Sequence, residues 1–195
     1  DRRSTEAGLK YFILGGLSSG IFIYALSLVY AVTGTTNLEA IGTALSVPGT
    51  IDNPILILGL ILRVASLAFK IAAVPFHMWA PDAYSGAPTP ISLFISVASK
   101  AAAFAMLIRL LFVAFEPMAA SWTALLAVIS VATMTFGNIA AISQDNVKRM
   151  FAYSSIAHAG YALMGVVAGT RYGIAAAMFY LLAYTFMNVG AWGMI

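Results

Sequence analysis

Six long apolar runs constrain this chain more than any other feature of its sequence. Polar or helix-breaking stretches separate the runs, which lie at roughly residues 8–32, 54–73, 90–114, 121–142, 147–168 and 173–195. About 20 consecutive apolar residues are enough for a helix to cross a bilayer. Because 62% of the residues are hydrophobic and only 9% are charged, one water-soluble core cannot hold them. The sequence therefore predicts an all-α, polytopic transmembrane helix bundle.

Composition also excludes several classes of function. The chain has no cysteine, so it can form neither a disulfide nor a thiolate metal site. With only two histidines and seven acidic residues, the chain has few candidate ligands for a metal site, and we expect no cofactor in it. The basic residues are scattered, which argues against nucleic-acid binding. Since the chain starts at Asp1 without Met and stops inside an apolar run, we expect one truncated transmembrane domain over residues 1–195.

The basic residues predict how the spans are oriented. Counting spans places one group of them on the same side of the membrane: Arg2, Arg3, Lys10, Lys148 and Arg149. The opposite side carries three acidic residues and one arginine. Lysine and arginine concentrate on the cytoplasmic side of membrane proteins, so we expect the first group to face the cytoplasm.

Lys70 lies toward the end of the second span, and Pro75 follows it. Proline removes a backbone donor and clashes with the carbonyl four residues earlier, so the helix should break between residues 73 and 76 and resume toward Trp79. A broken helix at membrane depth is tolerated only inside protein or beside a hydrated cavity. The break beside Lys70 therefore favours a functional role for this lysine in the membrane. The alternative is a lysine at a helix end whose side chain snorkels to the membrane surface.

Lys100 lies about 10 residues into the third span, roughly 15 Å deep. Burying a lysine there costs about 2.5–3.5 kcal/mol on the insertion scale. Removal from water favours the neutral amine, and a group that gains and loses a proton easily suits a proton relay. The alternative is a structural lysine that binds backbone carbonyls.

Both histidines have two interpretations. His158 lies near mid-depth in the fifth span and shares a helical face with Ser154 and Tyr161, so it could carry protons or simply pack in the core. His77 follows the Pro75 break and could pass protons between water and Lys70, or cap the broken helix. Arg63 lies inside the second span, and the sequence offers it no partner.

Three segments closely resemble the antiporter-like subunits of respiratory complex I. They are FKIAAVPFHMWAPDAY at 69–84 with GAPTP at 86–90, NVKRMFAYSSIAHAGY at 146–161, and EAGLKYF at 6–12. The last two are similar to the subunit N branch, the counterpart of mitochondrial subunit 2. Such long motifs are specific, and the similarity covers nearly the whole chain.

The resemblance implies a larger antiporter-like fold with inverted repeats, each containing a broken helix, of which this chain holds six spans. It implies that Lys70 and Lys100 are proton-carrying lysines. It also implies that the acidic partner of Lys70, and a further charged residue, belong to helices outside these 195 residues.

The function implied is a proton-translocating membrane subunit of NADH:quinone oxidoreductase in a bacterial inner (plasma) membrane. The implied proton relay comprises Lys70, Lys100, His158 and His77, with Pro75 as the structural helix break. NADH, FMN, iron–sulfur clusters and quinone would be bound by the other subunits, which would be the partners together with the lipid bilayer. A subunit of a multi-subunit cation/proton antiporter and a non-pumping membrane scaffold stay open as alternatives.

Overall fold

The computed structural model describes residues 2–195, and six of its helical stretches are long and apolar enough to cross a membrane. These stretches span residues 4–33, 54–71, 89–114, 116–142, 147–167 and 171–192, which confirms the predicted spans to within a few residues. The helices are α1 (Arg2–Thr33), α2 (Leu38–Leu45), α3 (Pro54–Ile71), α4 (Trp79–Gly86), α5 (Thr89–Phe94), α6 (Lys100–Arg109), α7 (Ala119–Ile142), α8 (Val147–Val167) and α9 (Arg171–Trp192).

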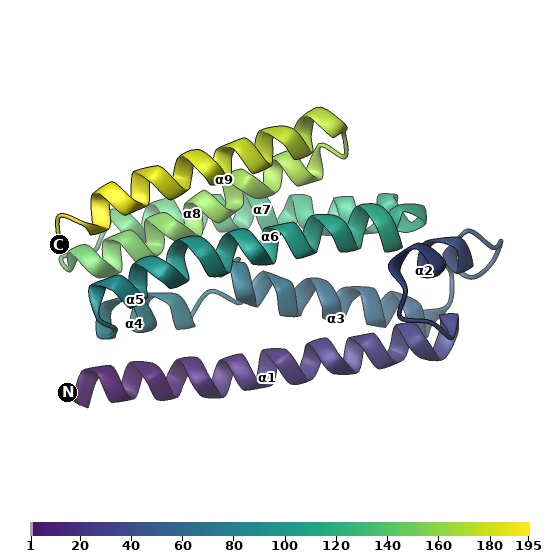
Figure 1. The fold of residues 1–195 in the computed structure, drawn as a ribbon, viewed down its shortest axis with the longest axis horizontal. Helices are drawn as coiled ribbons and strands as arrows, with labels where there is room; N and C mark the ends of the chain where they lie inside the picture. The colour runs from purple at the N-terminus through teal and green to yellow at the C-terminus, as the bar shows by residue number, and fades with distance from the viewer. Residues whose placement is uncertain (1) are drawn as a thin grey trace.

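The long helices lie side by side along the longest axis of the molecule (Figure 1). Both termini lie at one end, together with the short helices α4 and α5, whereas α2 lies at the other end. The third span is one continuous rod, because π turns at Ile95–Ser99 and Leu110–Ala114 join α5 and α6 and extend α6. Successive spans therefore cross the bundle in alternating directions.

The predicted break in the second span is confirmed. α3 ends at Ile71, Ala72 adopts a left-handed conformation with φ 58°, and the helix resumes only at Trp79. Two side chains form hydrogen bonds with the backbone around the break. The indole Nε1 of Trp79 donates to the carbonyl of Phe69 at 2.9 Å, and the amide of Val74 donates to Thr133 Oγ1 on α7 at 3.0 Å. Such pairing lets irregular backbone lie at membrane depth.

Two stretches that the sequence presents as loops contain helices. The connector between the first two spans holds α2, whose start is capped by the side chain of Asn37, an acceptor for the amide of Ala40. The proline-rich segment 81–90 is helical as far as Gly86 and turns only at residues 87–88. Pro81 is compatible with α4 because it occupies the first turn, where amides have no partner within the helix.

α7 and α8 pack closely against each other at two glycines. A Cβ placed on Gly137 would lie 2.6 Å from the backbone nitrogen of Ala157, and one on Gly160 would lie 2.8 Å from that of Met134. The absence of a side chain at both positions lets the two backbones approach. This contact fixes the position of α8, which carries much of the site described next.

Candidate functional site

Lys100 lies at the start of α6, directly after the π turn at Ile95–Ser99, and only 2% of it is exposed. Its Nζ donates to the carbonyl oxygen of Ser155 at 2.6 Å and to the hydroxyl of the same residue at 2.5 Å. The ring of Tyr184 on α9 lies 5.8 Å from Nζ, within the range of a cation–π contact. One amine buried in the bundle is therefore held by α8 and α9 together.

His158 contacts the same tyrosine. Its ring centroid lies 5.0 Å from that of Tyr184, and its Nδ1 lies 2.5 Å from the hydroxyl of Tyr180, one turn earlier on α9. Lys100 and His158 also interact electrostatically. The structure thus brings these two sequence-predicted residues together across one aromatic ring. We call Lys100, Ser155, His158, Tyr180 and Tyr184 the Lys100 cluster.

The sequence analysis did not identify the serine of α8 that contacts Lys100. Ser154 was grouped with His158, but the residue that contacts Lys100 is its neighbour Ser155, which is 2% exposed. Tyr161 does lie beside the His158 ring, at 5.6 Å between centroids. Sequence reasoning missed both α9 tyrosines. Their spacing of four residues, on one face of an apolar span, is the signal that could have found Tyr180 and Tyr184.

Lys70 lies apart from this cluster. It occupies the last turn of α3, where the helix dipole favours a cation, and its side chain is half-buried. Among the described residues it has no hydrogen-bond or ion-pair partner, and no contact there joins it to Lys100 or His158. It lines a cavity of about 270 Å³ with residues of α1, α3 and α6: Ser18, Ser19, Phe22, Ile23, Ser66, Leu67 and Met106.

His77 lies in the break between α3 and α4, two residues after Pro75. Its ring packs against Phe136 of α7, with 4.5 Å between the centroids, and its buried Nδ1 has no partner within residues 2–195. Burial lowers the pKa of His77. No side chain caps the start of α4, so the ring does not play the capping role that the sequence left open.

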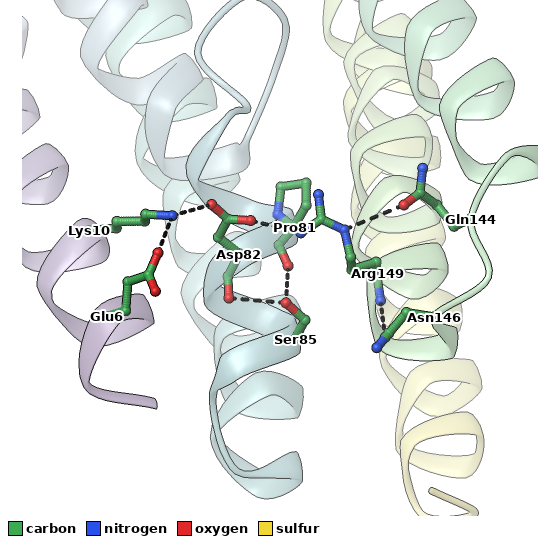
Figure 2. Close-up of polar contacts among 8 residues, drawn as sticks. All are labelled: Glu6, Lys10, Pro81, Asp82, Ser85, Gln144, Asn146 and Arg149. Carbon is green, nitrogen blue, oxygen red and sulfur yellow. Dashed lines mark hydrogen bonds and ion pairs between the residues drawn. The ribbon is translucent and has the colours of Figure 1, made fainter. Parts of the chain in front are cut away.

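Asp82 joins three helices at the end of the bundle where the chain termini lie, as Figure 2 shows. Its two carboxylate oxygens bind Lys10 of α1 at 2.9 Å and Arg149 of α8 at 2.7 Å, and Glu6 binds Lys10 at 2.8 Å. The hydrogen bond from Lys10, with that from Arg149, holds the pKa of Asp82 below its usual value although burial opposes this. We call these four residues the Asp82 clamp. Sequence analysis used its cations only as signals of orientation.

Arg63, for which the sequence offered no partner, is buried with 2% of it exposed. Its guanidinium carbon lies 5.4 Å from the centroid of the Phe22 ring on α1, so a cation–π contact accounts for part of its burial. Its Nε has no hydrogen-bond partner within the described part of the chain.

Known proteins are similar to this chain in sequence and in fold. The chain is 52% identical to NADH-quinone oxidoreductase subunit N of Trichlorobacter lovleyi over 99% of its own length and 40% of that protein. It matches the solved respiratory complex I of Thermus thermophilus with bound aureothin at a TM-score of 0.81 and 40% identity, covering 99% of this chain and 40% of that one.

The Mrp complex from Dietzia has the same fold, with a TM-score of 0.87 at 24% identity over 96% of this chain and 34% of that one. The present chain spans about 40% of the length of the curated relatives it matches. A family model described as NADH:quinone oxidoreductase/Mrp antiporter, TM, matches residues 1–195. This multi-pass membrane chain therefore belongs to the NADH:quinone oxidoreductase/Mrp antiporter transmembrane family.

Proposed function

We propose that this chain is part of a proton-translocating membrane subunit of NADH:quinone oxidoreductase that corresponds to subunit N. The observation that carries the proposal is the buried amine of Lys100, held by Ser155 and faced by the Tyr184 ring. An ionisable group inside a transmembrane bundle is costly and marks an ion pathway by default. The 52% identity to a protein named as subunit N supports this member of the family over others.

The residues have distinct roles in this proposal. Lys100 takes up and releases a proton at its amine, and His158 is the next carrier, since both contact Tyr184. Lys70 is a second relay in the cavity lined by α1, α3 and α6. His77, in the break that Pro75 introduces, connects Lys70 to the cytoplasm. Movement of charge at one lysine changes the proton affinity of the next group because opposite charges favour, and like charges disfavour, the charged form.

Electron transfer takes place in other subunits of the proposed complex. They bind NADH, FMN, the iron–sulfur clusters and quinone, and they are the partners of this chain in the membrane and outside it. The chain itself supplies ionisable side chains and a water-excluding bundle. This division of labour fits a chain without cysteine, whose residues could not ligate an iron–sulfur cluster through thiolates.

A cation/proton antiporter subunit is the second candidate, because the description of the matching family model names the Mrp antiporter beside NADH:quinone oxidoreductase. The two functions share the fold but differ in the driving force: electron transfer from NADH in one, a cation gradient in the other. A non-pumping scaffold is a third candidate. The hydrogen bond from Lys100 to the Ser155 carbonyl is the contact expected of a purely structural lysine.

Inverted membrane vesicles that contain the complete complex separate these candidates. With NADH as the only energy source, we expect acidification of the vesicle lumen that is lost when Lys100 is replaced by alanine. Proton movement that requires a sodium gradient and does not depend on NADH would establish the antiporter instead. Undiminished NADH-driven pumping after alanine replacement of both Lys70 and Lys100 would leave only the scaffold.

A further inference from the structure

Two buried tyrosine hydroxyls converge on the residue that holds Lys100. Tyr84 of α4 is 1% exposed and Tyr184 of α9 is 5% exposed. Both lie close enough to the Ser155 hydroxyl to interact with it. Neither phenol oxygen forms a well-aligned hydrogen bond with any group in residues 2–195. Buried hydroxyls normally have a partner, so their convergence on Ser155 calls for an explanation.

The chemistry of a hydroxyl group supplies that explanation. A charged Lys100 has three N–H donors and no acceptor, so the Ser155 oxygen must accept from it and direct its own O–H elsewhere. A neutral Lys100 has a lone pair, so the Ser155 O–H can turn and donate to nitrogen. The oxygen of Ser155 then needs a new donor. A phenol hydroxyl meets both needs, because it accepts in the first state and donates in the second.

We propose that Ser155 is a positioning residue for proton transfer at Lys100, and that the hydroxyls of Tyr84 and Tyr184 complete a chain whose hydrogen bonds reverse direction with the charge of the lysine. Each change is a rotation about a C–O bond. No covalent O–H bond breaks, and the proton released by Lys100 goes to His158, the next carrier in the proposed function. This inference rests on the proposed function and adds to it a chain of hydroxyl groups that positions the amine in either charge state.

The surroundings favour this assignment. The titratable groups around Lys100 are His158 on α8, Tyr184 on α9 and Tyr84 on α4, and Lys70 on α3 lies farther along, beside Met106 of α6. No carboxylate belongs to this set within the described residues, so the Ser155 carbonyl and the neighbouring hydroxyl groups are the available partners of the ammonium.

The position of Tyr84 is fixed by the same short helix that carries the Asp82 clamp. Asp82 ties α4 to α1 and α8 by its two ion pairs. Two residues later, the carbonyl of Tyr84 accepts a hydrogen bond from the Ser92 hydroxyl at 2.8 Å, and its ring packs edge-on against Trp192. The phenol therefore has a fixed backbone and a packed ring, and its hydroxyl is what remains to reorient.

The test uses Ser155→Ala, Ser155→Thr and Tyr84→Phe in the complete complex, with Ser130→Ala as a matched control. The Ser130 hydroxyl is also buried and donates to a carbonyl, that of Gly160 at 2.8 Å, but it does not touch the Lys100 cluster. Protons pumped per NADH oxidised are measured in inverted vesicles from pH 5.5 to 9. Assembly is checked by native electrophoresis.

We expect Ser155→Ala to shift the pumping profile toward lower pH by about one unit, because it removes one charge-assisted bond to the ammonium and lowers its proton affinity about tenfold. Ser155→Thr keeps the hydroxyl and should restore the profile, and Ser130→Ala should match the wild type. Tyr84→Phe removes one oxygen and retains the packed ring, so it should assemble and shift the profile in the same direction.

Wild-type profiles for both Ser155→Ala and Tyr84→Phe, together with lost pumping in Lys100→Met, would refute the hydroxyl chain and leave the proposed function intact. Normal pumping in Lys100→Met would overturn both. If Ser155→Ala does not assemble, Tyr84→Phe decides the question alone.

Discussion

Replacement of Lys100 by methionine removes the ionisable nitrogen while it preserves most of the shape of the side chain. The structure allows its effect on folding to be worked out. The wild-type amine makes two hydrogen bonds to Ser155, each worth about 1.5–3 kcal/mol when one partner is charged. Against this stands a cost of about 2.5–3.5 kcal/mol for a lysine at this depth. The net loss of stability should therefore lie between zero and about 3 kcal/mol.

The Lys100→Met substitution also leaves few polar groups without a hydrogen-bond partner. The Ser155 carbonyl belongs to the interior of α8, and the Ser155 hydroxyl can bond a carbonyl one turn earlier in its own helix. Lys100→Met should thus assemble and retain electron transfer while proton pumping falls to the background. The assay pairs lumen acidification in inverted vesicles with NADH oxidation and thermal denaturation of the solubilised complex.

Two results would refute this reasoning. Full pumping per NADH oxidised in an assembled Lys100→Met complex would show that the amine does not carry protons. Loss of assembly would show that the two bonds to Ser155 stabilise the bundle far more than the insertion cost offsets. Lys100→Arg is the complementary variant, since arginine keeps the charge but does not deprotonate in proteins, and it should also fail to pump.

Further predictions concern the clamp and the α7–α8 contact. Asp82→Asn should lower stability by about 0.5–2 kcal/mol, as expected for two partly exposed ion pairs, and would be measured by thermal denaturation. Because the folded pKa of Asp82 is depressed, the contribution of the clamp is complete above the ordinary aspartate value of about 3.9 and is lost as the pH falls through the lower folded value, so changes between pH 8 and 5 should not affect it. A Tm difference between wild type and Asp82→Asn that varies over that range would contradict this. Gly137→Val should cost at least about 1–3 kcal/mol and reduce assembly on native gels, because its Cβ would meet the backbone of Ala157 at 2.6 Å; Gly20→Ala, with nothing within 4 Å, is the control.

The spans and the helix break could be predicted because both follow from local chemistry. Hydropathy depends on composition within one window, and Pro75 disrupts a helix whatever surrounds it. The short helices α2 and α4 were missed although they too depend on local chemistry, because local signals for a turn and for a helix overlap in these segments. The prolines of the 81–90 segment suggested a turn, yet Pro81 stands in the one part of a helix that accepts it.

The site was predicted only in part, because its other half comes from distant segments. Sequence singled out Lys100 and His158 by their cost in a bilayer, and the structure places them around one ring. The choice between adjacent Ser154 and Ser155 depends on how α8 is rotated against α6, which no single helix reveals. Tyr184 is an ordinary residue in an apolar span until α9 packs beside Lys100. The roles of Lys70 and His77 stay predictions.

The π turn before Lys100 has a consequence for helical phase. Ser92, Ser96 and Lys100 recur every fourth residue, and all three are buried. Steps of four residues in a regular α-helix drift by about 40° each, so such a row would turn away by about 80° over its length. The wider turn at Ile95–Ser99 takes up part of this excess. The result is a row of polar side chains that stays closer to one face of the span, about 12 Å long, from Ser92 beside α4 to the amine in the bundle interior.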